Sequence, residues 1–439
     1  MKSADRDSPQ PTRRGFLTAT SGLAALAGSG LSPHVARALE APQAPETAKD
    51  IVPFWGEHQA GVVTPAQAHT YLAAFDLATA KRSDVETLLR RWTDAAAALS
   101  EGRPVEIPGE GDYETEADSS DVLGLPPSRL TITFGFGLGL FEKDGVDRYG
   151  LRSGRPAAFV DLPHFPGDQL VAARTGGDLL VQACADNPQV AFHAARQLTR
   201  LAYGIANIRW VQSGFVSDFG AGRTPRNLMG FKDGTSNPAI NDAKEMDAVV
   251  WAGDEAPAWM RGGSYMVVRR ARMALEHWDR TKVSFQEQTF GRQKLSGAPL
   301  GGKSEFDPLD LEAKDANGDP LIPENAHVRI ANQMTREGTK ILRRSYSYND
   351  GANITAERWP PWRQGMEFDA GLIFICHQRD LANGFIKIFQ KLSRYDMMNQ
   401  FVTNVGGGAF AVPRGAAKGE FIGQRLFQPT SQRSSEKPT

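Results

Sequence analysis

The order of strands and helices read from hydrophobic spacing is the feature of this 439-residue chain that most restricts its fold. The spacing predicts strands and helices in the order strand, helix, strand, strand, helix, strand, at residues 69–78, 84–99, 129–135, 178–184, 188–203 and 208–216. This order is that of a ferredoxin-like unit. We therefore expect an α+β fold with an antiparallel sheet in the first half of the chain.

The second half repeats this order. Gly371-Leu-Ile-Phe-Ile-Cys376 resembles Leu179-Leu-Val-Gln-Ala-Cys184, and each run is followed by an acidic residue and a predicted helix. A long Gly-, Asp- and Pro-rich excursion, residues 291–325, interrupts the repeat and predicts a surface loop. We expect two tandem ferredoxin-like halves with antiparallel sheets, residues 39–222 and 223–428, followed by a disordered tail at 429–439.

The first 38 residues read as an export signal. Thr12-Arg13-Arg14-Gly15-Phe16-Leu17 resembles a twin-arginine motif; a mildly apolar stretch follows, and then the small-x-small site Ala36-Arg37-Ala38. The alternative is an unstructured tail that contains two arginines by chance. The twin-arginine interpretation predicts a protein folded with its cofactor before export, and a location in the periplasm or outside the cell.

Composition excludes several classes of protein. The chain has 50 basic and 51 acidic residues, which argues against a nucleic-acid binder that works by bulk charge. Residues 1–38 hold five basic and two acidic residues, so the mature chain carries 45 and 49, a net charge of about −4. Only two cysteines are present, which excludes a disulfide scaffold or a multi-cysteine metal site. No apolar run reaches about 18 residues, so no membrane span is expected.

A segment at the junction of the halves, residues 223–238, is the first candidate for chemistry. Asp233 stands between Gly230 and Gly234, which would let a flat ligand approach the backbone, and arginines lie just upstream. Ligand sites also favour interfaces between domains. The alternative is a turn in which Asp233 bonds its own backbone.

Two further segments follow downstream. Glu324-Asn-Ala-His327-Val-Arg329 carries one of the eight histidines, and a lone histidine is more often a surface or core residue than a ligand. Residues 341–348 alternate like a strand around Arg343 and Arg344, so one arginine must face inward or into a cleft. An inward arginine needs an anionic or strongly polar partner. An edge strand with two solvated arginines is the alternative.

Gly-x-x-Asp-Gly-Thr, a later Ala-His-x-Arg and then Leu-Arg-Arg-x-Tyr-x-Tyr resemble, in this order, the dye-decolourising (DyP-type) haem peroxidases. The likeness spans about residues 50–425, and the export signal resembles the exported branch that includes deferrochelatase-like peroxidases. It implies one non-covalent haem b per chain, held mainly by the second half. Ser345 departs from the pattern, because many relatives have glycine after the arginine pair.

The resemblance also implies roles for individual residues. His327 would be the iron ligand, oriented by Asp396, with Asp369 as the reserve. Asp233 would be the acid–base group and Arg343, rather than Arg344, the stabiliser of developing charge. The other implied haem contacts are Arg226, Asn227, Gly230, Gly234, Arg329, Leu372 and Phe374.

The expected function is a peroxidase that reduces hydrogen peroxide and oxidises bulky organic donors such as dyes and phenols. The second hypothesis is a deferrochelatase, or an iron-oxidising component of periplasmic iron uptake, because the same pocket serves both chemistries. Expected partners are therefore hydrogen peroxide, an organic electron donor and possible iron-uptake proteins. Self-association into a homo-oligomer is left open, and no nucleic acid is expected.

Overall fold

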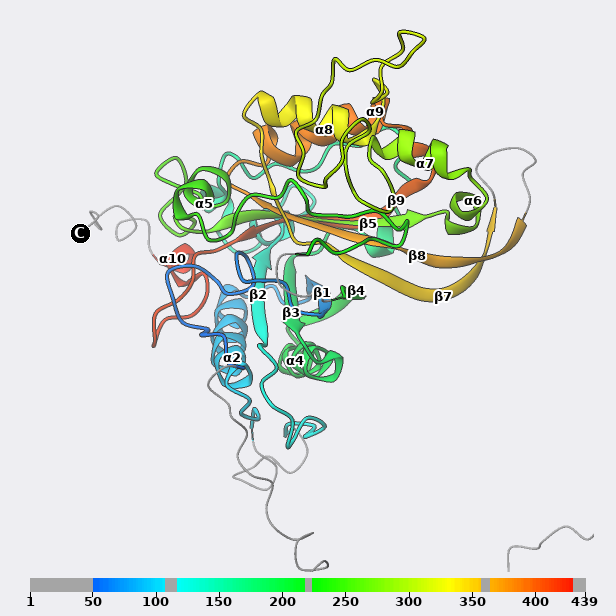
Figure 1. Ribbon diagram of the computed structural model, residues 1–439. Helices are drawn as coiled ribbons and strands as arrows, with labels where there is room; N and C mark the ends of the chain where they lie inside the picture. The colour runs from blue at the N-terminus through cyan, green and yellow to red at the C-terminus, as the bar shows by residue number, and fades with distance from the viewer. Residues whose placement is uncertain (1–49, 107–116, 218–222, 357–363, 429–439) are drawn as a thin grey trace, which may run out of the picture. The chain divides into compact units, whose positions relative to one another are not determined.

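The computed structural model describes residues 50–106, 117–217, 223–356 and 364–428 (Figure 1). The expected export signal, residues 1–38, and the expected tail, residues 429–439, lie outside the described residues. No helix in the described part of the chain is long and apolar enough to cross a membrane.

The first half contains the predicted strands and helices in the predicted order. Its elements are β1 (His69–Leu77), α2 (Arg82–Ser100), β2 (Thr131–Phe136), α3 (Leu138–Phe141), β3 (Leu179–Ala185), α4 (Pro188–Leu201) and β4 (Ala206–Phe215), with 3-10 turns at Arg152–Gly154 and Ala172–Arg174. Helix α4 begins where the sequence indicates, because Pro188 occupies its first turn and the Asn187 side chain accepts from the backbone N–H groups of Gln189 and Val190.

The second half follows the same plan with more helices. Its elements are α5 (Ala243–Val249), β5 (Ser264–Met273), α6 (Leu275–Asp279), α7 (Val283–Phe290), α8 (His327–Arg336), β6 (Leu342–Arg343), β7 (Tyr346–Ala356), β8 (Gln364–Gln378), a π-helical turn (Ala382–Ile386), α9 (Lys387–Tyr395), a 3-10 turn (Met397–Gln400), β9 (Val402–Val412) and α10 (Gln424–Phe427). The excursion at 291–325 contains no helix or strand within this described range, as predicted.

All strands of the described residues belong to one sheet, whereas the sequence predicted a sheet for each half. The order is β5-β9-β2-β3-β1-β4-β7-β8-β6, and β5 also pairs with β8, so the sheet closes on itself through antiparallel pairs. The halves meet through β4 with β7 and through β2 with β9. The expectation of separate sheets was wrong because an exposed edge strand presents unpaired N–H and C=O groups, and joining the edges satisfies them.

Strands β6 and β7 are one strand interrupted at residues 344–345. Leu342 pairs with His377 and Tyr346 pairs with Ile373, and between them the Arg344 N–H donates to the Ile375 carbonyl at 2.8 Å. The register on β8 is therefore continuous. Because side chains alternate across a strand, the two neighbouring arginines must point to opposite faces of the sheet.

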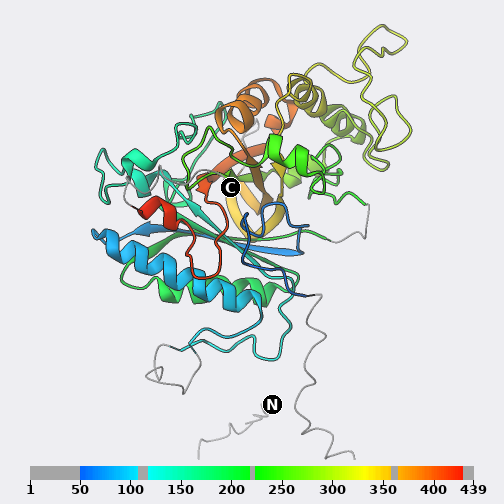
Figure 2. The ribbon, with the colours of Figure 1, turned by 90° about the vertical axis from the view of Figure 1, so that its left-hand side faces the viewer.

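The interior of the closed sheet is a hydrophobic core. One cluster of buried side chains collects residues from strands around the whole ring, including Leu72, Leu180, Met266, Ile373 and Phe410. Helices α2 and α4 cover the outer face of the first-half strands, and α8 and α9 lie over the second-half strands (Figures 1 and 2). The candidate functional residues lie around a cavity under α8 and α9.

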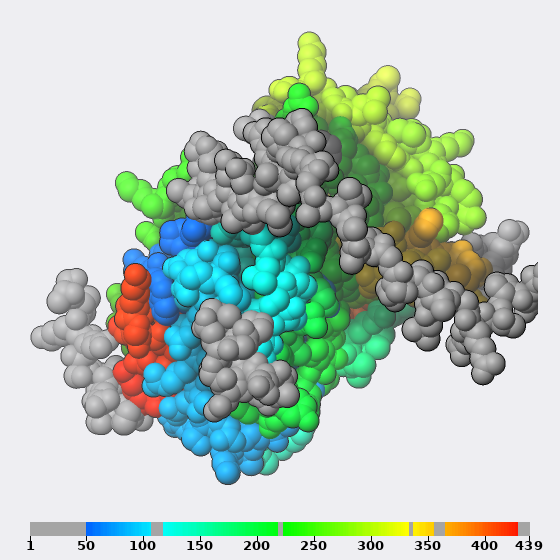
Figure 3. Space-filling model, turned by 90° about the horizontal axis from the view of Figure 1, so that it is seen from below, coloured from blue at the N-terminus to red at the C-terminus, as the bar shows by residue number. Residues whose placement is uncertain are grey.

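The last described residues, around Phe421 and Ile422, lie against the first half. Figure 3 shows the last described residues, in red, beside the blue of helix α2. The Ile422 N–H donates to the Thr93 hydroxyl at 3.0 Å, and the Arg90 guanidinium lies 4.3 Å from the centre of the Phe421 ring. These residues belong to the second half by sequence, but they pack against helix α2 of the first half.

Candidate active site

His327 is the first residue of helix α8, and its imidazole is held by a carboxylate. The His327 Nδ1 lies 2.6 Å from Asp396 Oδ2, between α9 and the 3-10 turn that follows it. The other oxygen of Asp396 accepts from the Met398 N–H at 2.8 Å, so the carboxylate cannot turn away. Nδ1 is used by Asp396, which leaves Nε2 as the nitrogen that can bind a metal.

Burial and the carboxylate of Asp396 act in opposite directions on the protonation of His327. Burial by itself disfavours the imidazolium, but the charge of Asp396 and its hydrogen bond together raise the pKa of His327 above its ordinary value. The Asp396 side chain is only 4% exposed, whereas 30% of the His327 side chain is exposed towards the cavity beside it. Asp396 therefore fixes the orientation of the imidazole through Nδ1 and raises its basicity, while part of the ring stays accessible to the cavity.

Asp369, the reserve candidate for orienting the histidine, serves another purpose. Its Oδ1 lies 2.9 Å from Arg270 Nη2, and its Oδ2 lies 3.7 Å from Arg174 Nη1. These contacts are on strand β5 and on the 3-10 turn Ala172–Arg174, and not at His327. The structure thus selects Asp396 over Asp369 as the partner of the histidine.

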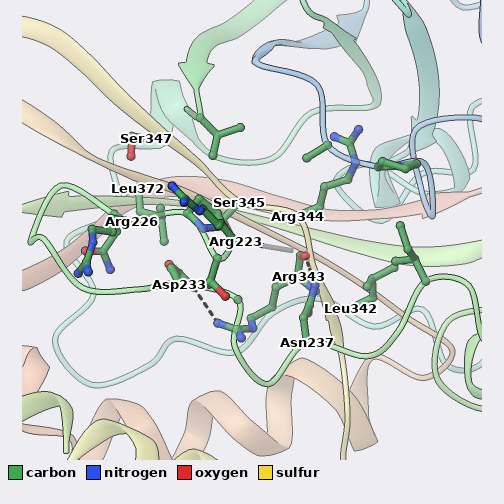
Figure 4. Close-up of a pocket in the computed structure, with 18 of the residues that line it drawn as sticks. Arg223, Arg226, Asp233, Asn237, Leu342, Arg343, Arg344, Ser345, Ser347 and Leu372 are labelled. Atoms are coloured by element: carbon green, nitrogen blue, oxygen red, sulfur yellow. Dashed lines mark hydrogen bonds and ion pairs between the residues drawn. The ribbon is translucent and has the colours of Figure 1, made fainter. Parts of the chain in front are cut away.

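Asp233 and Arg343 form a second pair in the same cavity. Arg343 Nη1 donates to Asp233 Oδ1 at 2.9 Å (Figure 4). The Asn237 side chain donates to the Arg343 carbonyl and accepts from the Arg343 N–H, both at 2.8 Å, and so fixes the strand beside the loop. The turn interpretation of Asp233 is wrong for its side chain, because the carboxylate bonds a distant arginine.

The two neighbouring arginines separate as the strand register requires. Arg343 faces the cavity, whereas Arg344 is 6% exposed and donates to Tyr346 Oη, Gln67 Oε1 and Cys184 Sγ. Those partners are polar but not carboxylates, so the expectation of a strongly polar partner for an inward arginine is met without an anion. Of the pair, Arg343 is the one available to a ligand.

The cavity that joins these groups has a volume of about 370 Å³ and is mostly apolar. Leu372 and Phe374 lie on the same face of β8 as Arg343 and line it, as predicted. The described residues that line it run from Asn227 to Asn404, so the second half supplies all of them. We call this space the histidine cavity.

Several predicted ligand contacts are placed differently. Arg226 does not line the histidine cavity, because its guanidinium donates to the carbonyls of Gly230, Lys294 and Leu295 at 2.6–2.7 Å. Arg329 donates to the carbonyls of Leu311 and Ile322, and so it anchors the excursion. These two arginines shape loops around the site.

The glycines and the asparagine of the junction loop define its backbone. Gly230 and Gly234 have φ values of +85° and +129°, which residues with a side chain rarely adopt. The Asn227 side chain accepts from the N–H groups of Met229 and Phe231. Asn227 and Gly234 line the histidine cavity, and Gly230 does not.

This geometry corresponds to known proteins. A family model described as Dyp-type peroxidase, N-terminal, matches residues 59–216, and one described as Dyp-type peroxidase, C-terminal, matches residues 224–417. The chain belongs to the Dyp-type peroxidase family. The resemblance found in the sequence is confirmed.

Relatives of this Dyp-type peroxidase carry two descriptions. A protein named deferrochelatase from Escherichia coli K12 is 37% identical over 432 residues, which cover 95% of this chain and 97% of that protein. A DyP-type peroxidase from Streptomyces coelicolor is 41% identical with a TM-score of 0.77, covering 88% of this chain and all of the other. Ferric DtpA from Streptomyces lividans is 40% identical with a TM-score of 0.76 and the same coverage.

Two residues of this Dyp-type peroxidase site were missed by sequence reasoning. Arg269 lines the histidine cavity, bonds the buried Asp168 through Nη2, and has a buried Nε without a partner among the described residues. Glu305, in the excursion, accepts from Thr224, Thr235 and Lys232 around the Asp233 loop. Arg269 carried a signal, because a charged residue in the apolar run of β5 is unusual. Glu305 carried none.

Proposed function

We propose that this Dyp-type peroxidase binds one haem b non-covalently in the histidine cavity, reduces hydrogen peroxide and oxidises organic donors such as dyes and phenols. The observation that carries the proposal is that the His327–Asp396 pair and the Asp233–Arg343 pair line one apolar cavity. Bound haem would supply the iron that takes the two oxidising equivalents of peroxide and passes them to the donor.

The residues of the cavity fit a haem. Its apolar walls suit the porphyrin face, and its polar groups are few, as in most cofactor sites. The unpartnered Nε of Arg269 is a buried donor that a haem propionate would satisfy, since guanidinium matches carboxylate geometry. His327 would bind the iron through Nε2, with Asp396 fixing the tautomer. The order of strands and helices supports tandem ferredoxin-like halves, and the lining of the cavity by second-half residues supports a haem held mainly by that half.

Asp233 and Arg343 would handle the proton and the charge of peroxide cleavage. Breaking the O–O bond to release water needs a proton to leave one oxygen and arrive on the other, and the Asp233 carboxylate can accept it and return it. Arg343 keeps two guanidinium nitrogens beyond the one that bonds Asp233, and these can stabilise the charge that develops on the departing oxygen. Leu372 and Phe374 limit the water that reaches the reaction.

The test is the visible spectrum and the peroxide reaction of purified protein. Haem-loaded wild-type protein should show a Soret band that is altered in His327→Ala. Asp233→Asn should keep the haem and lose the fast reaction with peroxide. A chain that takes up no haem, or a His327→Ala spectrum identical to wild type, would overturn the proposal.

The second candidate function is a deferrochelatase, and it is favoured by the name of relatives that are 37% identical over 95% of this chain. Iron release would give free iron and intact protoporphyrin, whereas peroxidase turnover couples donor oxidation to peroxide loss. Product analysis separates the two. A role in iron uptake would further predict partner proteins of that system, tested by co-purification from iron-starved cells.

We propose export by the twin-arginine route to the periplasm or beyond, on the sequence of residues 12–38 alone. Replacing Arg13 and Arg14 by lysine should leave the protein in the cytoplasm with its leader intact. Cell fractionation and N-terminal sequencing check this, and export of the double variant at the wild-type level would contradict it.

A further inference from the structure

A second cavity, of about 340 Å³, adjoins the histidine cavity at the Asp233–Arg343 pair, and Figure 4 shows the residues that line it. The two cavities share Asn227, Asp233, Gly234, Arg343 and Leu372. Unlike the histidine cavity, this one is also lined by the first half, through Val62, Thr64, Pro65, Ala66 and Val216. We call it the arginine cavity, because Arg223, Arg226, Arg343 and Arg344 line it.

The charge of the arginine cavity is strongly positive. Among the described residues that line it, four are arginines, and Asp233 is the acidic one. Asp233 is already paired with Arg343, so it neutralises only one of the four positive charges. A site with this balance favours an anionic ligand over a neutral or cationic one.

Two of the four arginines have donors left for a ligand. Arg226 donates to three carbonyls, and Arg344 turns its guanidinium into the core. Arg343 uses one nitrogen on Asp233, and its other two make no hydrogen bond with described residues. Arg223 is exposed and lies beside Ser345 and Leu372 in Figure 4. A carboxylate placed between Arg223 and Arg343 would meet a guanidinium on each side.

The rest of the wall combines apolar side chains with neutral polar ones. The apolar part of the lining consists of Val62, Val216, Ile240, Leu342 and Leu372, together with Pro65, Ala66 and Pro225. A ligand that satisfies both surfaces has a carboxylate at one end and a hydrophobic ring at the other. The volume lies near the lower end of the range for small-molecule sites, which favours one ring over the several rings of a dye.

We propose that the arginine cavity binds single-ring aromatic carboxylates, and that phenolic members of this class are inner-site electron donors. The inference rests on the proposed peroxidase function and adds the substrate class of a second site. The chemistry balances: two phenolic donors each lose one electron and one proton to become phenoxyl radicals, and one hydrogen peroxide becomes two waters. Donors too large for the cavity would react elsewhere on the protein.

Binding is tested on the haem-loaded protein without turnover. Calorimetry should detect 4-methoxybenzoate, which lacks the phenol, and show much weaker binding of 4-methoxybenzyl alcohol, which has no charge. Arg223→Gln should weaken binding of the acid about tenfold, the size of a charge-assisted hydrogen bond at a part-exposed site. Arg155→Gln is the matched control, because Arg155 is exposed and lines neither cavity.

Turnover then tests the donor role. With 4-hydroxy-3-methoxybenzoate, Arg223→Gln should raise KM about tenfold, while KM for the neutral 4-hydroxy-3-methoxybenzyl alcohol stays at the wild-type value. Ile240→Trp, which fills the cavity from an exposed position, should weaken binding of 4-methoxybenzoate in calorimetry. Equal binding of acid and alcohol, or equal binding of the acid by wild type and Arg223→Gln, overturns this inference. Failure to oxidise either phenol would instead overturn the proposed function, since calorimetry does not depend on turnover.

Discussion

Both carboxylate oxygens of Asp396 accept a hydrogen bond. Replacing Asp396 by asparagine converts one of these oxygens into an NH₂ group. Oδ2 receives the His327 Nδ1–H and Oδ1 receives the Met398 N–H. An asparagine has one acceptor oxygen, so it can serve only one of these donors. If the oxygen stays with Met398, the new NH₂ faces His327 and favours the tautomer with its proton on Nε2, the nitrogen needed for a metal.

The magnitude follows from the bond that is lost. A hydrogen bond to a charged group contributes about 1.5–3 kcal/mol, and the 2.6 Å contact to a carboxylate that is 4% exposed belongs to this class. At about 1.4 kcal/mol for each factor of ten, haem affinity should fall roughly 10- to 100-fold. Without the charge of Asp396 to oppose burial, the pKa of His327 should fall in the haem-free variant.

Haem loss is measured by mixing the loaded protein with an excess of a tight haem acceptor and following the Soret band. Asp369→Asn is the matched control, since it makes the same chemical change at a carboxylate that contacts Arg270 instead. The Asp396 variant should release haem at least tenfold faster than the control. Equal release rates in the two variants would refute the role given to Asp396.

The remaining predictions concern stability and loop position. Burial lowers the pKa of His377 to about 3, so its unfolded state binds more protons below its ordinary value of 6.5, and stability is lost as pH falls through this window. His377→Leu should therefore reduce the loss of unfolding free energy between pH 7 and pH 4 by about 3 kcal/mol in denaturant titrations; an unchanged loss would contradict it. Glu305→Gln should slow the peroxide reaction about tenfold in stopped-flow measurements by loosening the loop of the acid–arginine pair, while the exposed Glu312→Gln should not. Gly407→Ala would put a Cβ 1.9 Å from the Val268 carbonyl oxygen at φ +119°, which should cost roughly 2–3 kcal/mol; it should therefore unfold about 3–4 °C below wild type by circular dichroism, and a wild-type melting temperature would contradict it.

The predicted order of the main strands and helices held because period-two and period-3.6 patterns are local properties of the chain. The closure of the sheet was not predicted. It depends on β4 meeting β7 and β2 meeting β9, contacts between residues more than a hundred positions apart. Edge pairing of this kind leaves little trace in sequence, because backbone groups form it whatever the side chains are.

Some residues of the candidate site could also be predicted from the sequence, and others could not. His327, Asp233 and the arginine pair stand in motifs with fixed spacing, so they were found from sequence together with the family. The alternation of residues 341–348 also determined that one arginine faces inward and its neighbour does not. Arg226 and Arg329, expected to contact the cofactor, bond loop carbonyls in the structure, and an arginine near a motif cannot be distinguished in sequence from one that does so.

The sequence by itself determined the chemistry, because residue types and their order along a strand or loop limit what can bind iron or move a proton. Only the tertiary structure decided which carboxylate orients His327, since Asp396 reaches it from the end of another helix. It alone also placed Arg269, Glu305 and the arginine cavity, where first-half and second-half residues meet. Those features depend on distances between remote segments, and such distances exist only once the chain has closed its sheet and packed its core.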